Sequence, residues 1–179
     1  MQKTKQLLEH VQQDYIDYLK SHKNDLPVEV QLSVPKISRG ENYLGLPFLI
    51  LDYPRCFKME NTFAIRTMFW WGNFFSITLH LSGSYKKNYE NSITRWYPLL
   101  KKEKYFISIS QNEWEHHFEK SNYAGINTLS KAGFEKNVQK HFFLKIAYKI
   151  PVSQWNETAE KLLHHFKILI GLTGQLPRR

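Results

Sequence analysis

The stretch from Tyr43 to Gly83 constrains the fold most strongly, because it holds the densest run of apolar and aromatic residues in the chain. Its clearest pattern is the strict alternation of residues 74–82, which is typical of a β-strand whose successive side chains point to opposite faces. One face would carry Phe75, Ile77, Leu79 and Leu81, and the other Ser76, Thr78, His80 and Ser82.

Two more strands are predicted beside this one. Residues 63–70 are joined to it by Trp71-Gly72-Asn73, and Gly and Asn tolerate the positive φ that tight hairpin turns need. The apolar run 48–51 starts at Pro47 and stops at Pro54. Proline lacks an N–H group and therefore suits strand ends. Together these segments predict an antiparallel three-stranded meander, with residues 55–62 as a loop.

The remaining elements are predicted from periodicity and from stop signals. Helical spacing favours helices over 3–22, 111–119, 130–140 and 153–171, and a broken helix over 84–103 that Pro98 interrupts. Asn24 and Pro27 would end the first helix, and Ser110 with Glu113 forms a capping-box pattern for the one at 111–119. Alternation predicts strands over 28–34, 105–110 and 142–150, and residues 37–42 read as a polar loop.

Short turns rather than alternating helices join the predicted strands, so the sheet should be mainly antiparallel. The sequence therefore predicts an α+β protein with a five- or six-stranded antiparallel sheet and helices packed on one face. A chain of 179 residues fits a single domain, 1–179, with 171–179 as a loose tail.

The apolar runs, the cysteine count and the charge of the sequence indicate where the protein is located and what it binds. The N-terminal segment lacks the continuous apolar core of a signal peptide, and no apolar run reaches the roughly 20 residues of a membrane helix. One cysteine excludes an internal disulfide, so we expect a cytoplasmic protein that does not enter membranes. The net charge of +9 comes entirely from residues 61–179, but the lysines are scattered, which is more typical of a solvated surface than of a nucleic-acid footprint.

The polar residues of the meander are the main candidate binding site. An arginine with a histidine and aromatic walls would suit a small anionic or planar ligand. The plainer interpretation is that a carboxylate pairs with an arginine and that Ser76, Thr78 and His80 face water. The candidate ligand-binding residues are Asp52, Arg55, Arg66, Trp70, Trp71 and His80.

No cofactor or metal is predicted. Glu113 with His117, and Glu160 with His164, have the i, i+4 spacing of helical metal ligands, but such pairs are frequent by chance. Cys56 follows Arg55, which could lower a thiol pKa, but a lone cysteine is more often a small buried apolar residue. The sequence shows no phosphate-binding glycine loop, nucleophile elbow or dinucleotide fingerprint.

These observations favour a non-catalytic binding or protein-interaction protein whose site lies on the meander, with another protein or a small anionic ligand as partner. One alternative is an enzyme in which His80 is the general acid/base and Arg66 holds an anionic substrate. The other is a nucleic-acid-binding module in which Trp70, Trp71, Phe74 and Phe143 stack on bases among the lysines.

Overall fold

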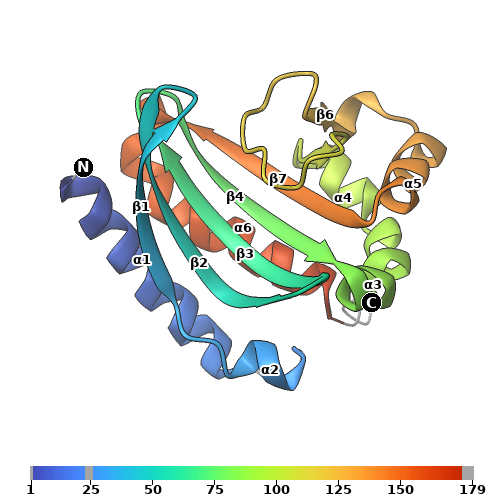
Figure 1. Cartoon of the computed structure of the whole chain (residues 1–179), viewed down its shortest axis with the longest axis horizontal. Coiled ribbons are helices and arrows are strands. Elements are labelled where there is room, and N and C mark those ends of the chain that lie inside the picture. Colours follow the sequence, from blue (N-terminus) through green and yellow to red (C-terminus); the bar gives the residue numbers. More distant parts are fainter. Residues whose placement is uncertain (1, 23–25, 175–179) are drawn as a thin grey trace.

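The computed structural model describes residues 2–22 and 26–174. Within them, seven strands form one antiparallel sheet in the order β1-β2-β3-β4-β7-β5-β6 (Figure 1). The strands are β1 (Lys36–Tyr43), β2 (Leu46–Lys58), β3 (Asn61–Trp70), β4 (Phe74–Ser82), β5 (Phe106–Ser108), β6 (Tyr123–Gly125) and β7 (Phe143–Pro151).

Two long helices and several short ones flank the sheet. Helices α1 (Gln2–Lys20) and α6 (Thr158–Leu172) contact each other and pack against strands β2, β3 and β4. Figure 1 shows the other helices near the end of the sheet where β4 stops and β7 begins, apart from α2, which lies below β1. These are α2 (Val28–Gln31), α3 (Gly83–Arg95), α4 (Tyr97–Lys102), α5 (Lys131–Lys140) and the 3-10 turn η2 (Ile126–Thr128). The 3-10 turn η3 (Val152–Glu157) follows β7 at the opposite end of the sheet, beside the β3–β4 hairpin.

The predicted α+β class and antiparallel sheet are confirmed, but the sheet has seven strands where five or six were expected. The meander is also confirmed. Gly72 adopts a φ of 71°, and the Asn73 N–H donates to the Trp70 carbonyl at 3.0 Å, which closes the predicted hairpin.

Three predictions near the first strands are wrong. Residues 28–31 form α2 instead of a strand, and Val28 and Val34 are exposed, so their alternation does not mark a buried face. The expected polar loop 37–42 belongs to β1, whose polarity suits a sheet edge beside solvent. Most of the expected loop 55–62 extends β2 and β3, so the connection shrinks to a turn at Met59 and Glu60.

The helix expected over 111–119 is also absent, because its supposed cap is used otherwise. The Ser110 hydroxyl accepts from the Asn112 N–H at 3.0 Å and donates to Glu115, instead of capping Glu113. By contrast, the helix predicted over 130–140 forms α5, and the Ser130 hydroxyl caps it by accepting from the Gly133 N–H at 3.1 Å. The helix that Pro98 was expected to interrupt is divided earlier, at Trp96, and Pro98 lies in the first turn of α4.

The main core lies between the sheet and the two long helices. The Tyr15 ring of α1 stacks on the Phe166 ring of α6, with centroids 3.8 Å apart. The Tyr15 hydroxyl hydrogen-bonds the Thr67 hydroxyl of β3 at 3.0 Å, which satisfies both polar groups inside the core. Burial raises the pKa of Tyr15 well above its ordinary value of 10.0, so this tyrosine stays neutral.

No helix among the described residues has the length and apolarity needed to cross a membrane. The expected loose tail begins inside α6, which continues to Leu172, and its last five residues (175–179) lie outside the described part of the chain. The predicted helix stop at Asn24 also lies outside it, and α1 ends at Lys20.

Candidate functional site

Both faces of the central strand β4 are buried, although one of them is polar. Helices α1 and α6 cover the apolar face. The second face is crossed by an irregular segment, residues 109–122, which we call the cover segment; Figure 1 shows it as the yellow loop in front of β4 and β7. Ser76, Thr78 and His80, which would face water in the plainer interpretation, are therefore enclosed.

An ion pair lies at the centre of this polar face. Asp52 of β2 and Arg66 of β3 are directly opposite each other in the strand register. The Arg66 Nε and Nη2 atoms donate to the two carboxylate oxygens of Asp52 at 2.8 and 2.9 Å. The side chains are only 15% and 10% exposed, so this bidentate pair replaces water for both charges.

A histidine and a glutamate meet beside this pair. The His80 Nε2 atom of β4 lies 2.8 Å from the Glu113 Oε2 atom of the cover segment. The Trp114 ring packs edge-on against His80, with centroids 5.5 Å apart. Burial lowers the pKa of His80, and the carboxylate of Glu113 partly opposes that shift.

Lys145 is the most deeply enclosed charge of the site. It faces His80 in the register of β4 and β7, and it is 1% exposed. Its ammonium donates to the Glu113 carbonyl at 3.0 Å and also to the Glu115 carbonyl. Among the residues that the structure describes, Lys145 forms no ion pair with a carboxylate. Burial and the nearby Arg66 lower its pKa to about 7, and the carboxylates of Glu115 and Glu113 partly oppose that shift.

Tyr43 and His116 fix the middle of the cover segment. The Tyr43 hydroxyl accepts from the backbone N–H groups of His116 and His117 at 2.7 and 3.0 Å. The Arg66 Nη1 atom lies 3.4 Å from the His116 Nε2 atom. Burial, together with the charges of Lys145 and Arg66, lowers the pKa of His116 to about 2.

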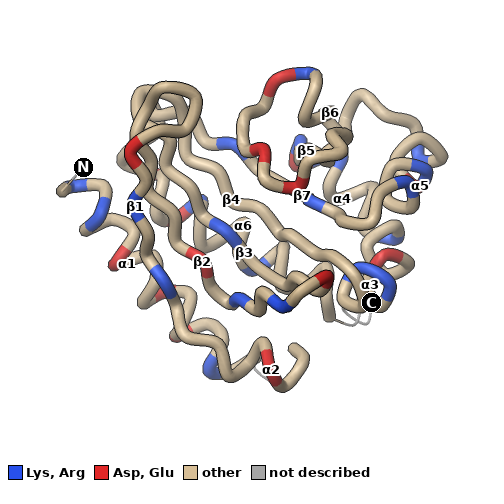
Figure 2. The backbone as a smooth tube through the Cα atoms, viewed as in Figure 1, with Lys and Arg blue, Asp and Glu red and all other residues tan. Residues whose placement is uncertain are grey.

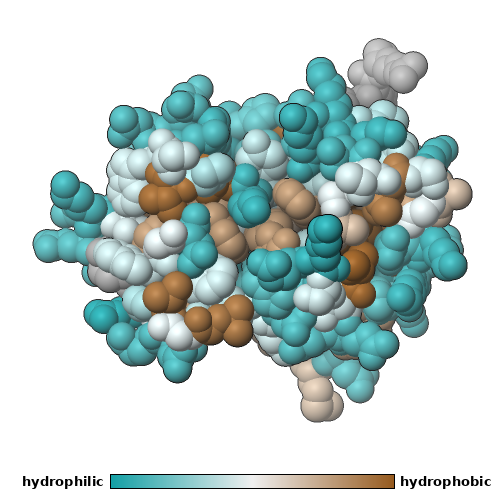
Figure 3. Space-filling model, turned by 90° about the horizontal axis from the view of Figure 1, so that it is seen from above, coloured by the Kyte–Doolittle hydropathy of each residue, from teal (hydrophilic) through white to brown (hydrophobic). Residues whose placement is uncertain are grey.

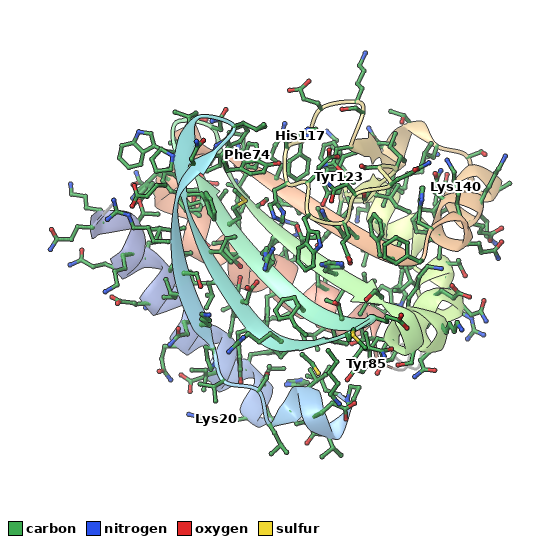
Figure 4. The ribbon with its side chains drawn as sticks, in the orientation of Figure 1. Lys20, Phe74, Tyr85, His117, Tyr123 and Lys140 are labelled. Atoms are coloured by element: carbon green, nitrogen blue, oxygen red, sulfur yellow. The ribbon has the colours of Figure 1, made fainter. Side chains whose placement is uncertain are left out.

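Aromatic contacts anchor the far end of the cover segment. Phe118 stacks on Tyr123, with centroids 4.6 Å apart, and meets Phe74 edge-on at 5.1 Å. The Lys149 ammonium lies 5.4 Å from the centre of the Phe118 ring. Figure 4 shows Phe74, His117 and Tyr123 where the segment passes over β4 and β7, and Figure 2 shows acidic residues of the segment near basic positions of the strands.

The structure brings together only half of the predicted site residues. Asp52, Arg66 and His80 converge on the polar face. Arg55 does not join them, because its Nε atom donates to the Val34 carbonyl at the sheet edge. Trp70 lies farther along the same face of β3 as Arg66, where its indole N–H donates to the Tyr43 carbonyl at 3.0 Å. Trp71 lies on the helix side of the sheet, near Phe69.

Sequence reasoning missed Lys145, Glu113, His116 and Tyr43. Lys145 stands on the polar side of the alternation in the strand 142–150, which was a usable signal. Its neighbour His80 follows only from the pairing of β4 with β7, which the sequence does not reveal. Glu113 and His116 were assigned to a helix that does not form.

The other candidate chemistries find less support in the geometry. Glu113 and His117 do not lie on a helix, and no group of three or more metal-ligating residues is present in the described part of the chain. Phe74 and Phe143 are buried, so they offer no platform for stacking bases. Cys56 is half-buried and accepts a long hydrogen bond from the Tyr85 hydroxyl at 3.6 Å.

The buried histidines predict a loss of stability in acid. The folded-state pKa of His116 lies below its ordinary value of 6.5, so below pH 6.5 the unfolded chain binds a proton that the folded chain does not. Stability therefore falls as the pH is lowered. Urea unfolding at pH 6.5 and 5.0 should show a loss from His116 alone of about 1.6 kcal/mol. The His116→Gln variant should lose that much less stability than the wild type, and the exposed His10→Asn variant is the control. An equal loss in His116→Gln would contradict the assignment.

No protein-family model matches the chain, and neither does any curated protein or any solved structure.

Proposed function

We propose that this is a cytoplasmic binding protein for a small anionic ligand, which it holds on the polar face of its sheet beneath the cover segment. The observation that carries the proposal is Lys145, an enclosed ammonium whose hydrogen-bond acceptors are two backbone carbonyls of the cover segment. A buried charge is costly unless an opposite charge accompanies it. An anion placed against Lys145 would supply that charge.

The neighbouring carboxylates are already engaged. Asp52 holds Arg66 through both of its oxygens, and Glu113 binds His80. Lys145 is thus the cation with unused capacity for a carboxylate or phosphate oxygen. Two of its three N–H groups donate to the carbonyls of Glu113 and Glu115, so a ligand oxygen would accept from the third.

Aromatic side chains beside the cations favour a ligand with a flat body. The Arg66 guanidinium lies 5.8 Å from the Phe57 ring centre and 6.0 Å from that of Trp114. Trp114 is 50% exposed and Phe57 is 39% exposed, so both present ring surface to solvent. A planar carboxylate would bring its charge to Lys145 or Arg66 and lay its body against these rings.

The test compares two lysines on the same face of β7. Inorganic phosphate and benzoate are titrated into the protein by calorimetry, and at least one should bind saturably. Lys145→Met should weaken that binding at least tenfold, because a charge-assisted hydrogen bond is worth about 1.5–3 kcal/mol. Lys149→Met removes the same charge from an exposed position and should change the affinity less than about twofold. Wild-type protein that binds neither probe, or Lys145→Met that binds as the wild type does, would overturn the proposal.

The second candidate function is an enzyme that uses the same residues. The specific observation in its favour is the contact of His80 with the Glu113 carboxylate, which orients the imidazole as a general acid/base requires. Turnover of p-nitrophenyl acetate or p-nitrophenyl phosphate that disappears in His80→Gln, while anion binding persists, would favour catalysis. A rate that does not change in His80→Gln would remove this candidate.

A further inference from the structure

A second concave site lies on the other side of the sheet, at the tip of the β3–β4 hairpin. The two adjacent tryptophans of the hairpin separate there: Trp70 belongs to the polar face, and Trp71 lines a pocket beside α1 and η3. This end of the molecule is on the left in Figure 3, where hydrophobic groups lie at the surface among hydrophilic ones.

The pocket has aromatic walls and a volume of about 700 Å³. Such a volume is within the range of small-molecule sites. The Phe69 ring lies between the two tryptophans of the pocket wall. Its centroid is 5.8 Å from that of Trp71 and 6.5 Å from that of Trp155, and both contacts are edge-on. Trp155 is also held by Phe75, with centroids 5.5 Å apart, so the inner wall is fixed by the core. Trp71 is 42% exposed and forms an accessible outer wall.

The charge around the pocket is of one sign. Its lining includes Lys3 and contains no acidic residue among the described residues. Lys3 belongs to the first turn of α1, which carries no acidic side chain, and no described carboxylate pairs with it. The apolar walls and the cation at the rim together fit a molecule with a flat apolar body and one carboxylate.

We propose that this pocket binds a small aromatic carboxylate, with the ring between Trp71 and Trp155 and the carboxylate beside Lys3. The site is separate from the polar face, because Phe69 and Arg66 point to opposite faces of β3. Its occupancy does not depend on Lys145 or on the cover segment.

The experiment uses 3-phenylpropionate and its neutral counterpart 3-phenylpropan-1-ol as probes, titrated into the full chain and followed by calorimetry and ligand-observed NMR. Wild-type protein should bind 3-phenylpropionate about three- to fivefold more tightly than the alcohol, since an exposed charge adds at most about 1 kcal/mol. Trp71→Ser should weaken the binding of both probes about tenfold, because it removes one wall.

Three further variants make the result specific. Val152→Phe fills the pocket without removing an aromatic wall and should also weaken both probes. Lys3→Gln should abolish the preference for the carboxylate, whereas Lys5→Gln, two residues along the same helix, should keep it. Probes that bind Trp71→Ser and Val152→Phe as they bind the wild type, or that fail to bind the wild type, would overturn the site. An equal affinity of the wild type for the alcohol and the acid would overturn its assignment to carboxylates.

Discussion

Asp52→Ala is expected to lower the free energy of unfolding by about 3–5 kcal/mol, because it leaves the Arg66 guanidinium enclosed without its carboxylate. In the native protein both Asp52 oxygens accept from Arg66, and the two side chains are almost fully withdrawn from water. Urea or guanidinium unfolding at pH 7.5 measures the loss directly.

The double variant makes this prediction specific to the ion pair. Replacing Arg66 with Met in the Asp52→Ala background removes the orphaned charge, so the double variant should be more stable than Asp52→Ala alone. If instead the two losses simply add, the two residues are not coupled, and the arrangement of the polar face described above is wrong.

Phe166→Ala is expected to destabilise the protein by a similar amount, about 3–5 kcal/mol, because it opens a cavity in the centre of the core. The Phe166 ring is completely buried and stacks on Tyr15 at 3.8 Å, which joins α6 to α1. Thermal and chemical unfolding should both show the loss.

A matched control is Phe142→Ala, which deletes the same side chain at a position that is 66% exposed. That change should alter the stability by no more than about 0.5 kcal/mol. A small effect of Phe166→Ala, comparable to that of Phe142→Ala, would show that α1 and α6 do not share the core described here.

Some of the candidate site was predictable and some was not. Arg66 and His80 stood out as polar residues within apolar strands, and their strands were correctly placed. Asp52 was linked to them only as a member of a polar set, and the register supplied the actual pairing. Trp71 and Arg55 were predicted to belong to the same site, yet one lies on the helix side and the other at the sheet edge.

The sequence by itself determined the β3–β4 hairpin and the class of the fold. The strict alternation over 74–82 and the turn at Gly72 depend only on residues close together in the sequence. Because a period of two fits an extended strand and not a helix, these signals predict the hairpin without any tertiary contact. Helix α5 was also predicted from its local pattern, as a helix over 130–140.

Only the tertiary structure decided that the polar face of the sheet is enclosed. The cover segment has a helical pattern and a capping-box sequence, but Glu113 binds His80 and its carbonyl accepts from Lys145. These partners lie more than thirty residues away along the chain in each case, and each buried polar group gains more from its hydrogen bond here than one exposed helical turn would supply. The long-range polar contacts therefore outweigh the local helical propensity of residues 111–119. Because these residues form no helix, they can cover the polar face and complete the site.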